Sequence, residues 1–154
     1  MFSLKITGID KAVRQLDRLE KLFDGELKKT MFKAGELVSS DAKRNFVKNK
    51  SVDTGLGLSS IGHEEVAKAD EVVSIVGAGA EHMKYIETGT RPHWPPPEPI
   101  RRWAKRKLKN EKLGFLVSRK IAQKGTQSKP FLYPALEKNL AKIMDMITKA
   151  LKPR

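Results

Sequence analysis

Cysteine is absent from this 154-residue sequence, which excludes disulfide bonds, thiol catalysis and cysteine-ligated metals. Long hydrophobic runs are absent too, since no stretch approaches the roughly 18 apolar residues that are needed to span a bilayer. Residues 1–6 lack the apolar segment of a signal peptide, so we do not expect export by that route. The chain is therefore predicted to have no contact with a membrane.

The signatures of catalysis are also missing. No Gly-x-Ser-x-Gly motif, phosphate loop or dinucleotide fingerprint occurs. Glu87 has the chemistry of a general base, but no second group is placed to orient it. We interpret it as a structural carboxylate, held by the backbone amides of Gly89 and Thr90 or by Arg91. No histidine has metal-ligand spacing, which we tested for His63, His82 and His93. We expect neither an enzyme nor a cofactor.

Acidic residues are scarce in one region of a basic chain. The net charge is +13, and residues 100–129 hold eleven lysines and arginines against one acid, Glu111. So concentrated a positive field attracts nucleic acid, acidic protein or anionic membrane, and charge alone does not choose among them. We predict that this patch binds a charged partner, either acidic protein or DNA, through Arg101, Arg102, Lys105, Arg106, Lys109, Arg119 and Lys120.

Apolar residues at helical spacing predict two helices in the first third of the chain. One runs from Asp10 to about Phe23, and a longer one runs from Glu26 to Val47, with a break at Gly25 between them. The longer helix should bury one stripe, formed by Leu27, Met31, Ala34, Val38, Ala42 and Phe46. The hydrophobic content of 39% is typical of a globular protein, and the length suits a single domain covering residues 1–154.

Short β-like runs follow. Residues 53–57 indicate a turn that uses the freedom of glycine at positive φ. Residues 58–67, 72–76 and 83–88 are predicted to form three antiparallel strands in series, with the long helix covering their apolar face. Residues 2–6 alternate between apolar and polar and predict a further short strand or an ordered arm.

Five prolines between residues 92 and 99 impose an extended path that ends in a helix over 98–109. Trp103 shares an apolar stripe with Ile100 and Leu108, so we expect it to pack and not to stack on a base. A second short helix should end at Gly125, and the two form a basic helical insertion at about 98–125. A last helix runs from Pro134 to about Leu151, with a predicted buried face formed by Leu136, Leu140, Ile143, Ile147 and Leu151. The expected fold class is α+β.

Several motifs, taken in order, resemble one protein family. After the helical N-terminal part come Thr54-Gly55 before Ser60-Ile61, then Tyr85-Ile86-Glu87-Thr88-Gly89-Thr90, and finally Pro130-Phe131-Leu132-Tyr133-Pro134-Ala135. This order is similar to that of the tail-completion (neck) proteins of long-tailed bacteriophages, which are related to the lambda minor tail protein Z. The structural motif of that family corresponds here to Tyr85, Glu87, Gly89, Thr90, Pro130, Phe131 and Pro134.

The resemblance implies a non-enzymatic virion protein, made in the cytoplasm of a bacterial host, that assembles as a ring where tail meets head. The family suggests six copies per ring. The implied partners are other copies of the chain, neighbouring tail-tube, tail-terminator or head-connector proteins, and DNA in the lumen.

The proline-rich stretch suits such an assembly, because a preset conformation loses little entropy on docking. We expect an inter-subunit arm formed by Arg91, Pro92, His93, Trp94, Pro95, Pro96 and Pro97. The competing hypothesis is a nucleic-acid-binding protein of host or phage, which would use the basic helices within 100–129 without any ring.

Overall fold

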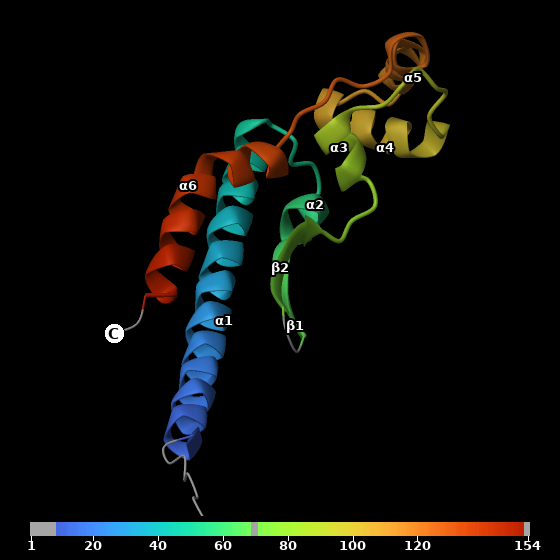
Figure 1. The fold of residues 1–154 in the computed structure, drawn as a ribbon. Coiled ribbons are helices and arrows are strands. Elements are labelled where there is room, and N and C mark those ends of the chain that lie inside the picture. Colours follow the sequence, from blue (N-terminus) through green and yellow to red (C-terminus); the bar gives the residue numbers. More distant parts are fainter. Residues whose placement is uncertain (1–8, 69–70, 153–154) are drawn as a thin grey trace, which may run out of the picture.

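The computed structural model describes residues 9–68 and 71–152, and the side chains of residues 25–66 and 71–152. The fold of these residues is α+β, as predicted, and the predicted strand at residues 2–6 lies outside the described residues. In chain order the elements are α1 (Ile9–Lys48), α2 (Leu56–Ser59), β1 (Ile61–Lys68), β2 (Glu71–Ala78), α3 (Met83–Thr88), α4 (Pro97–Leu108), α5 (Leu113–Lys124) and α6 (Leu132–Ala150) (Figure 1).

Helix α1 is one continuous helix of 40 residues, so the predicted break at Gly25 is wrong. A glycine inside a helix costs only about 1 kcal/mol relative to alanine, and strong helix formers surround this one. A Cβ built at Gly25 would meet nothing within 4 Å, so no packing demand explains the glycine. The apolar stripe predicted for the second half of α1 is confirmed from Ala34 onward, since Ala34, Val38, Ala42 and Phe46 are buried, whereas Leu27 and Met31 are half-buried.

The sheet has two antiparallel strands, with Ile61 opposite Ala78 at one end and Lys68 opposite Glu71 at the other. The predicted third strand at residues 83–88 is wrong, because these residues form helix α3. Six residues are too few to separate a period of 2 from one of 3.6. Gly89, at φ 73°, closes the helix by donating its amide to Tyr85 O at 2.9 Å. The prediction that the long helix covers the sheet is confirmed, since α1 packs on both strands.

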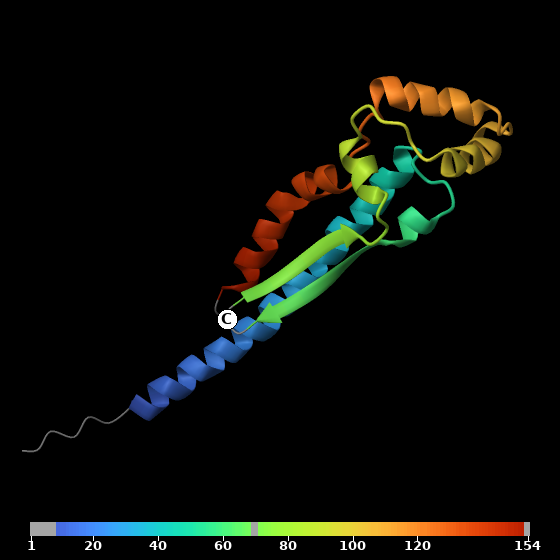
Figure 2. The ribbon, with the colours of Figure 1, turned by 90° about the vertical axis from the view of Figure 1, so that its right-hand side faces the viewer.

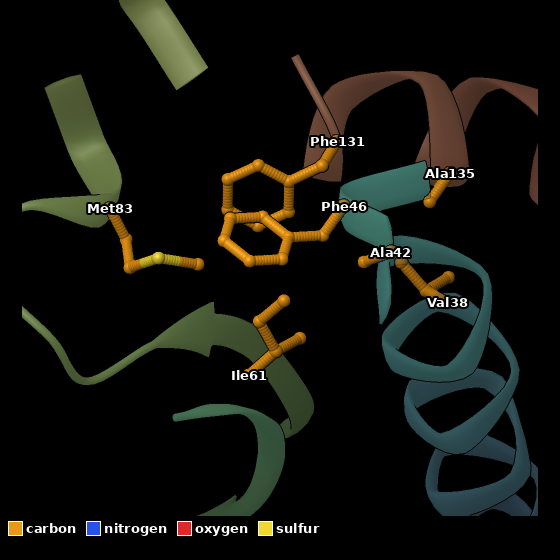
Figure 3. Packing of buried hydrophobic residues seen from close by; sticks show 7 residues of the cluster. All are labelled: Val38, Ala42, Phe46, Ile61, Met83, Phe131 and Ala135. Atoms are coloured by element: carbon orange, nitrogen blue, oxygen red, sulfur yellow. The ribbon is translucent and has the colours of Figure 1, made fainter. Parts of the chain in front are cut away.

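The core lies where α1, the sheet, α3 and the start of α6 meet. Its buried members are Val38, Ala42, Phe46, Ile61, Met83, Phe131 and Ala135 (Figure 3). Phe46 and Phe131 meet edge to face, with ring centroids 5.2 Å apart and an interplanar angle of 80°. Because these two residues are 85 positions apart in the sequence, their contact fixes the C-terminal segment on the end of α1.

Helix α6 lies along α1 (Figure 2) but turns a different face inward from the predicted one. The buried positions are Phe131, Ala135 and Asn139, with Ile143 packed against the core. The predicted face is wrong at Leu136, Leu140 and Leu151, which are exposed. Two apolar stripes run along this helix, and spacing alone does not tell which of them is buried.

A buried carboxylate joins the two long helices. Asp41 on α1 accepts hydrogen bonds from Asn139 Nδ2 at 2.7 Å, Lys138 Nζ at 3.1 Å and Arg44 NH1 at 2.8 Å. The amide of Asn139 first, and then the ammonium of Lys138, hold the pKa of Asp41 below its ordinary value of 3.8. Asn139 also donates to Ala135 O at 2.8 Å, so both donor hydrogens of its buried amide nitrogen are used.

The molecule is elongated (Figures 1 and 2). Its accessible surface is 12088 Å², against about 7,800 Å² for a compact monomer of 17.3 kDa. The chain by itself therefore leaves much more of its surface in water than a compact domain of its mass.

We expect Asp41→Ala to lower the free energy of unfolding by about 2 kcal/mol, because it removes the carboxylate that the Asn139 amide and two cations surround. The folded pKa of Asp41 lies below the unfolded one. The stabilisation is therefore present above about pH 3.8 and is lost as pH falls through the folded value. Urea denaturation at about pH 7 and about pH 3 should show a larger loss in the wild type than in the variant, since Asp53, whose pKa is also lowered, titrates in both.

Asp145→Ala is the matched control, since Asp145 is exposed and pairs only with Lys149 one turn away. It should change stability by about 0.5 kcal/mol or less. Equal losses from the two substitutions would contradict the role assigned to Asp41.

Candidate functional site

Glu87 on α3 caps the N-terminus of α6. Its Oε2 accepts hydrogen bonds from the backbone amides of Phe131 at 2.7 Å and Leu132 at 3.0 Å, and its Oε1 accepts from Tyr133 at 2.9 Å. The first amides of a helix have no partner inside the helix, and a negative charge suits its positive end. Phe131 occupies the N-cap position and offers no capping side chain of its own.

The carboxylate is thus held by backbone amides, as interpreted from the sequence, but the predicted partners are wrong. The amides belong to the segment entering α6, 44 to 46 residues further on, and not to the Gly89-Thr90 turn. Sequence reasoning looks for partners nearby and misses a cap that comes from another helix. The only signal is the pair of motifs that hold Glu87 and Phe131.

Two connections cross beside Glu87, one leading from α3 to α4 and the other from α5 to α6. Thr90 and Thr126 exchange backbone hydrogen bonds at 3.1 and 3.2 Å, and their hydroxyl oxygens lie 3.0 Å apart. The approach requires glycine on both sides: a Cβ at Gly89 would lie 2.5 Å from Thr126 O, and one at Gly125 would overlap Thr90 O. Both glycines also have positive φ. This crossing joins helices α4 and α5, which we call the basic helical pair, to the other described elements, which we call the body.

The proline segment, residues 91–97, runs along α5 and leads into α4. His93 donates its amide to Ile121 O at 3.4 Å, and Pro95 is buried. Trp94 is 62% exposed and lies beside Phe115 of α5, which is 64% exposed, with ring centroids 6.3 Å apart. The predicted arm is therefore laid against the helical pair, and it presents an aromatic pair to solvent. The sequence alone does not single out Phe115, because it lies 21 positions after Trp94.

Helices α4 and α5 lie close to their predicted positions. Pro97 is the first residue of α4, and Gly125 follows the last residue of α5. Gly114 allows the two helices to approach, since a Cβ there would lie 3.1 Å from the Cα of Arg101. Trp103 and Ile100 are half-buried, whereas Leu108 is exposed.

The structure divides the predicted basic patch into paired and unpaired cations. Arg106 binds both carboxylate oxygens of Asp53, at 3.3 and 2.5 Å, and its guanidinium holds the pKa of that carboxyl below the ordinary value. Arg101 pairs with Glu98 and Glu111, and Arg102 pairs with Glu98. These arginines therefore have structural contacts within the chain.

The remaining cations of the patch are exposed and form no ion pair with another described residue, and they comprise Lys105, Lys109, Arg119 and Lys120. Lys109 ends α4 in the left-handed conformation, at φ 57°. Nothing in the described part of the chain neutralises these four side chains. They remain available to a partner that carries negative charge.

A serine, a histidine and a glutamate line up between α1 and β1. Ser39 Oγ lies 3.3 Å from His63 Nδ1, and His63 Nε2 lies 3.5 Å from Glu65 Oε1. The order resembles a nucleophile, a base and an orienting acid. However, Ser39 is only 5% exposed, and its hydroxyl also lies within hydrogen-bond distance of Glu36 O, at 3.1 Å. As placed, the three side chains link the helix to the sheet and offer no room for a substrate at the hydroxyl.

Among the described residues there is neither a metal-binding cluster nor a membrane-spanning helix. No group of three or more histidine, aspartate or glutamate side chains is placed to hold a metal ion. No helix in the same part of the chain has the length and apolar character required to cross a membrane.

Comparison with protein-family models, with curated proteins and with solved structures found no match.

We expect Glu87→Ala to lower the free energy of unfolding by about 2 kcal/mol or more, because it leaves three amides at the start of α6 without an acceptor. Glu87→Gln keeps one acceptor oxygen and should cost less. Glu137→Ala, an exposed substitution on the same helix, serves as the control. Urea denaturation followed by circular dichroism measures all three, and a Glu87→Ala protein as stable as the control would refute the capping role.

Proposed function

We propose that this chain is a structural virion protein of the head–tail interface of a long-tailed bacteriophage. In this role it forms a ring that completes the tail and joins it to the head. The observation that carries the proposal is the excess of exposed surface, because an isolated chain of this shape leaves apolar side chains in water that neighbours in a ring would cover.

Many of the exposed apolar side chains lie in two groups. One stripe follows α6 and comprises Tyr133, Leu136, Leu140, Met144 and Leu151. A second group surrounds Trp94 and Phe115 on the basic helical pair. Separate patches of this kind suit a protomer with a neighbour on each side, as cyclic assemblies require.

The junction between body and helical pair supports the same role. A ring protein must hold its contact surfaces in fixed relative positions, since loosely held surfaces would lose entropy on every contact made. The Glu87 cap and the Thr90–Thr126 crossing supply such a fixed junction. Glu87, Thr90 and Phe131 of this junction belong to the motifs that carry the family resemblance, whereas Thr126 lies outside them.

A non-enzymatic role is also consistent with how the reactive groups are used. The two carboxylate oxygens of Glu87 accept hydrogen bonds from three backbone amides, and Ser39 is buried between helix and sheet. In the described part of the chain, the arrangements closest to catalytic ones are occupied in structural contacts.

Deletion of the gene for this chain from its phage should yield full heads and separate tails that do not join, seen by electron microscopy, with a large loss of infectious titre. The wild-type gene supplied in trans should restore joining. A variant with Trp94→Ala and Pro96→Gly should not restore joining, because it alters two exposed residues of the segment that is proposed to contact a neighbour. The buried Pro95 is kept so that the segment stays in place. Normal infectious particles from the deletion would refute the proposed function.

A further inference from the structure

The outer face of the β-hairpin is an uncovered apolar strip. On the inner face, His63 and Ser74 meet α1 at Gly35. Side chains alternate along a strand, so the cross-strand pairs Glu64–Ile75 and Val66–Val73 point the other way. Ile75 is 48% exposed and Val66 is 36% exposed. The hairpin lies in front of α1 in Figure 2, and no other helix of the described chain lies over this face.

The basic helical pair carries the second surface, which we call the aromatic patch. It consists of Trp94, Phe115 and Leu116, all of them more than half exposed. Lys112 and Arg119 lie three residues before and four residues after Phe115 on α5, so they flank it on the same helix face. Neither cation forms an ion pair with another described residue.

The hairpin and the basic helical pair carry opposite net charge. Residues 61–78 have a net charge of −3, from four acidic residues and one lysine, whereas residues 98–124 have +8, from ten basic and two acidic residues. In Figure 1 the helical pair lies at one end of the molecule, whereas the hairpin lies alongside the middle of α1. The two exposed apolar surfaces therefore lie apart on one elongated chain, on elements of opposite net charge.

We propose that the aromatic patch of one copy docks on the outer hairpin face of a second copy. Trp94 and Phe115 cover Val66, Val73 and Ile75. Lys112 and Arg119 face Glu64. The contact joins two different surfaces, so one copy keeps a free hairpin face, the other keeps a free aromatic patch, and the assembly continues from chain to chain. The inference deepens the proposed function by naming the ring contact, and it rests on that function for its biological setting.

A second copy fits the observations better than a nucleic acid. Phosphates would satisfy the cations and a base would stack on an aromatic ring. However, a strand of nucleic acid would leave the apolar strip of the hairpin in water, and Glu64 would repel it. Contact with a second copy covers both apolar surfaces at once and pairs their charges, as the centre and rim of protein interfaces do.

The test uses two variants of the full chain. The patch variant carries Trp94→Ser, Phe115→Ser and Arg119→Glu, and the face variant carries Glu64→Lys, Val66→Thr and Ile75→Thr. A control with Leu56→Ser and Lys43→Glu loses one exposed apolar side chain and one cation elsewhere. Sedimentation velocity of each protein at micromolar concentration, at about 0.05 and about 0.5 M salt, measures the assembly state. Thermal melting checks that each variant is folded.

The wild type and the control should sediment as assemblies, and each interface variant should sediment as the single chain. An equimolar mixture of the two variants should form a species of twice the protomer mass and nothing larger, because only one intact contact can form between them. High salt should weaken the wild-type assembly.

The inference is overturned by a wild type that stays a single chain, by interface variants that still assemble, by a control that loses assembly, or by a mixture that remains monomeric. A monomeric wild type that binds a single-stranded oligonucleotide, with loss of binding in the patch variant, would assign the patch to nucleic acid instead. If this contact fails its test while gene deletion leaves heads and tails unjoined, only the contact is refuted and the neck role stands. If the contact passes its test while gene deletion yields normal infectious particles, the neck role is refuted.

Discussion

The carboxylate of Glu87 holds the first amides of α6, and the positions of the other parts depend on this contact. It fixes the start of α6 on α3, which places Phe131 against Phe46 in the core. It also fixes the paths of the two connections that cross at Thr90 and Thr126. Three charge-assisted hydrogen bonds at a helix N-terminus are among the stronger contacts a single side chain can make. The basic helical pair therefore has a defined direction relative to the long helices.

The described fold combines a small core with a large exposed surface. The buried cluster is confined to one end of α1, while α6 and the hairpin contact α1 along a single side each. Asp41 supplements this limited core by joining the two long helices through Asn139 and Lys138. Much of the apolar surface that a compact fold would bury is left exposed on α6, on the hairpin and around Trp94. We interpret these surfaces as the places where neighbouring chains complete the structure.

The parts of this fold that sequence reasoning predicts are those with local signals. Pro97 and Gly125 delimit the basic helices, and β-branched residues mark the second strand within a few positions of where it lies. Local signals fail where two periods compete: residues 83–88 alternate like a strand yet form a helix, and both faces of α6 are apolar. Contacts between distant residues, such as those of Glu87 with Phe131 and of Trp94 with Phe115, leave no local trace. The sequence therefore predicts which residues belong to the candidate site but not how they are arranged in space.

If Glu87 fixes the basic helical pair relative to the body, the distance between α1 and α5 should depend on its carboxylate. Because the chain has no cysteine, spin labels can be placed at Lys43→Cys on α1 and Lys120→Cys on α5 alone. Pulsed electron resonance on the patch variant, which is expected to be monomeric, gives the distribution of distances between them. We expect one narrow distribution of label-to-label distances with Glu87 present and a broad one in the Glu87→Ala background. A distribution that is broad from the outset, or that Glu87→Ala leaves unchanged, would contradict this role of Glu87.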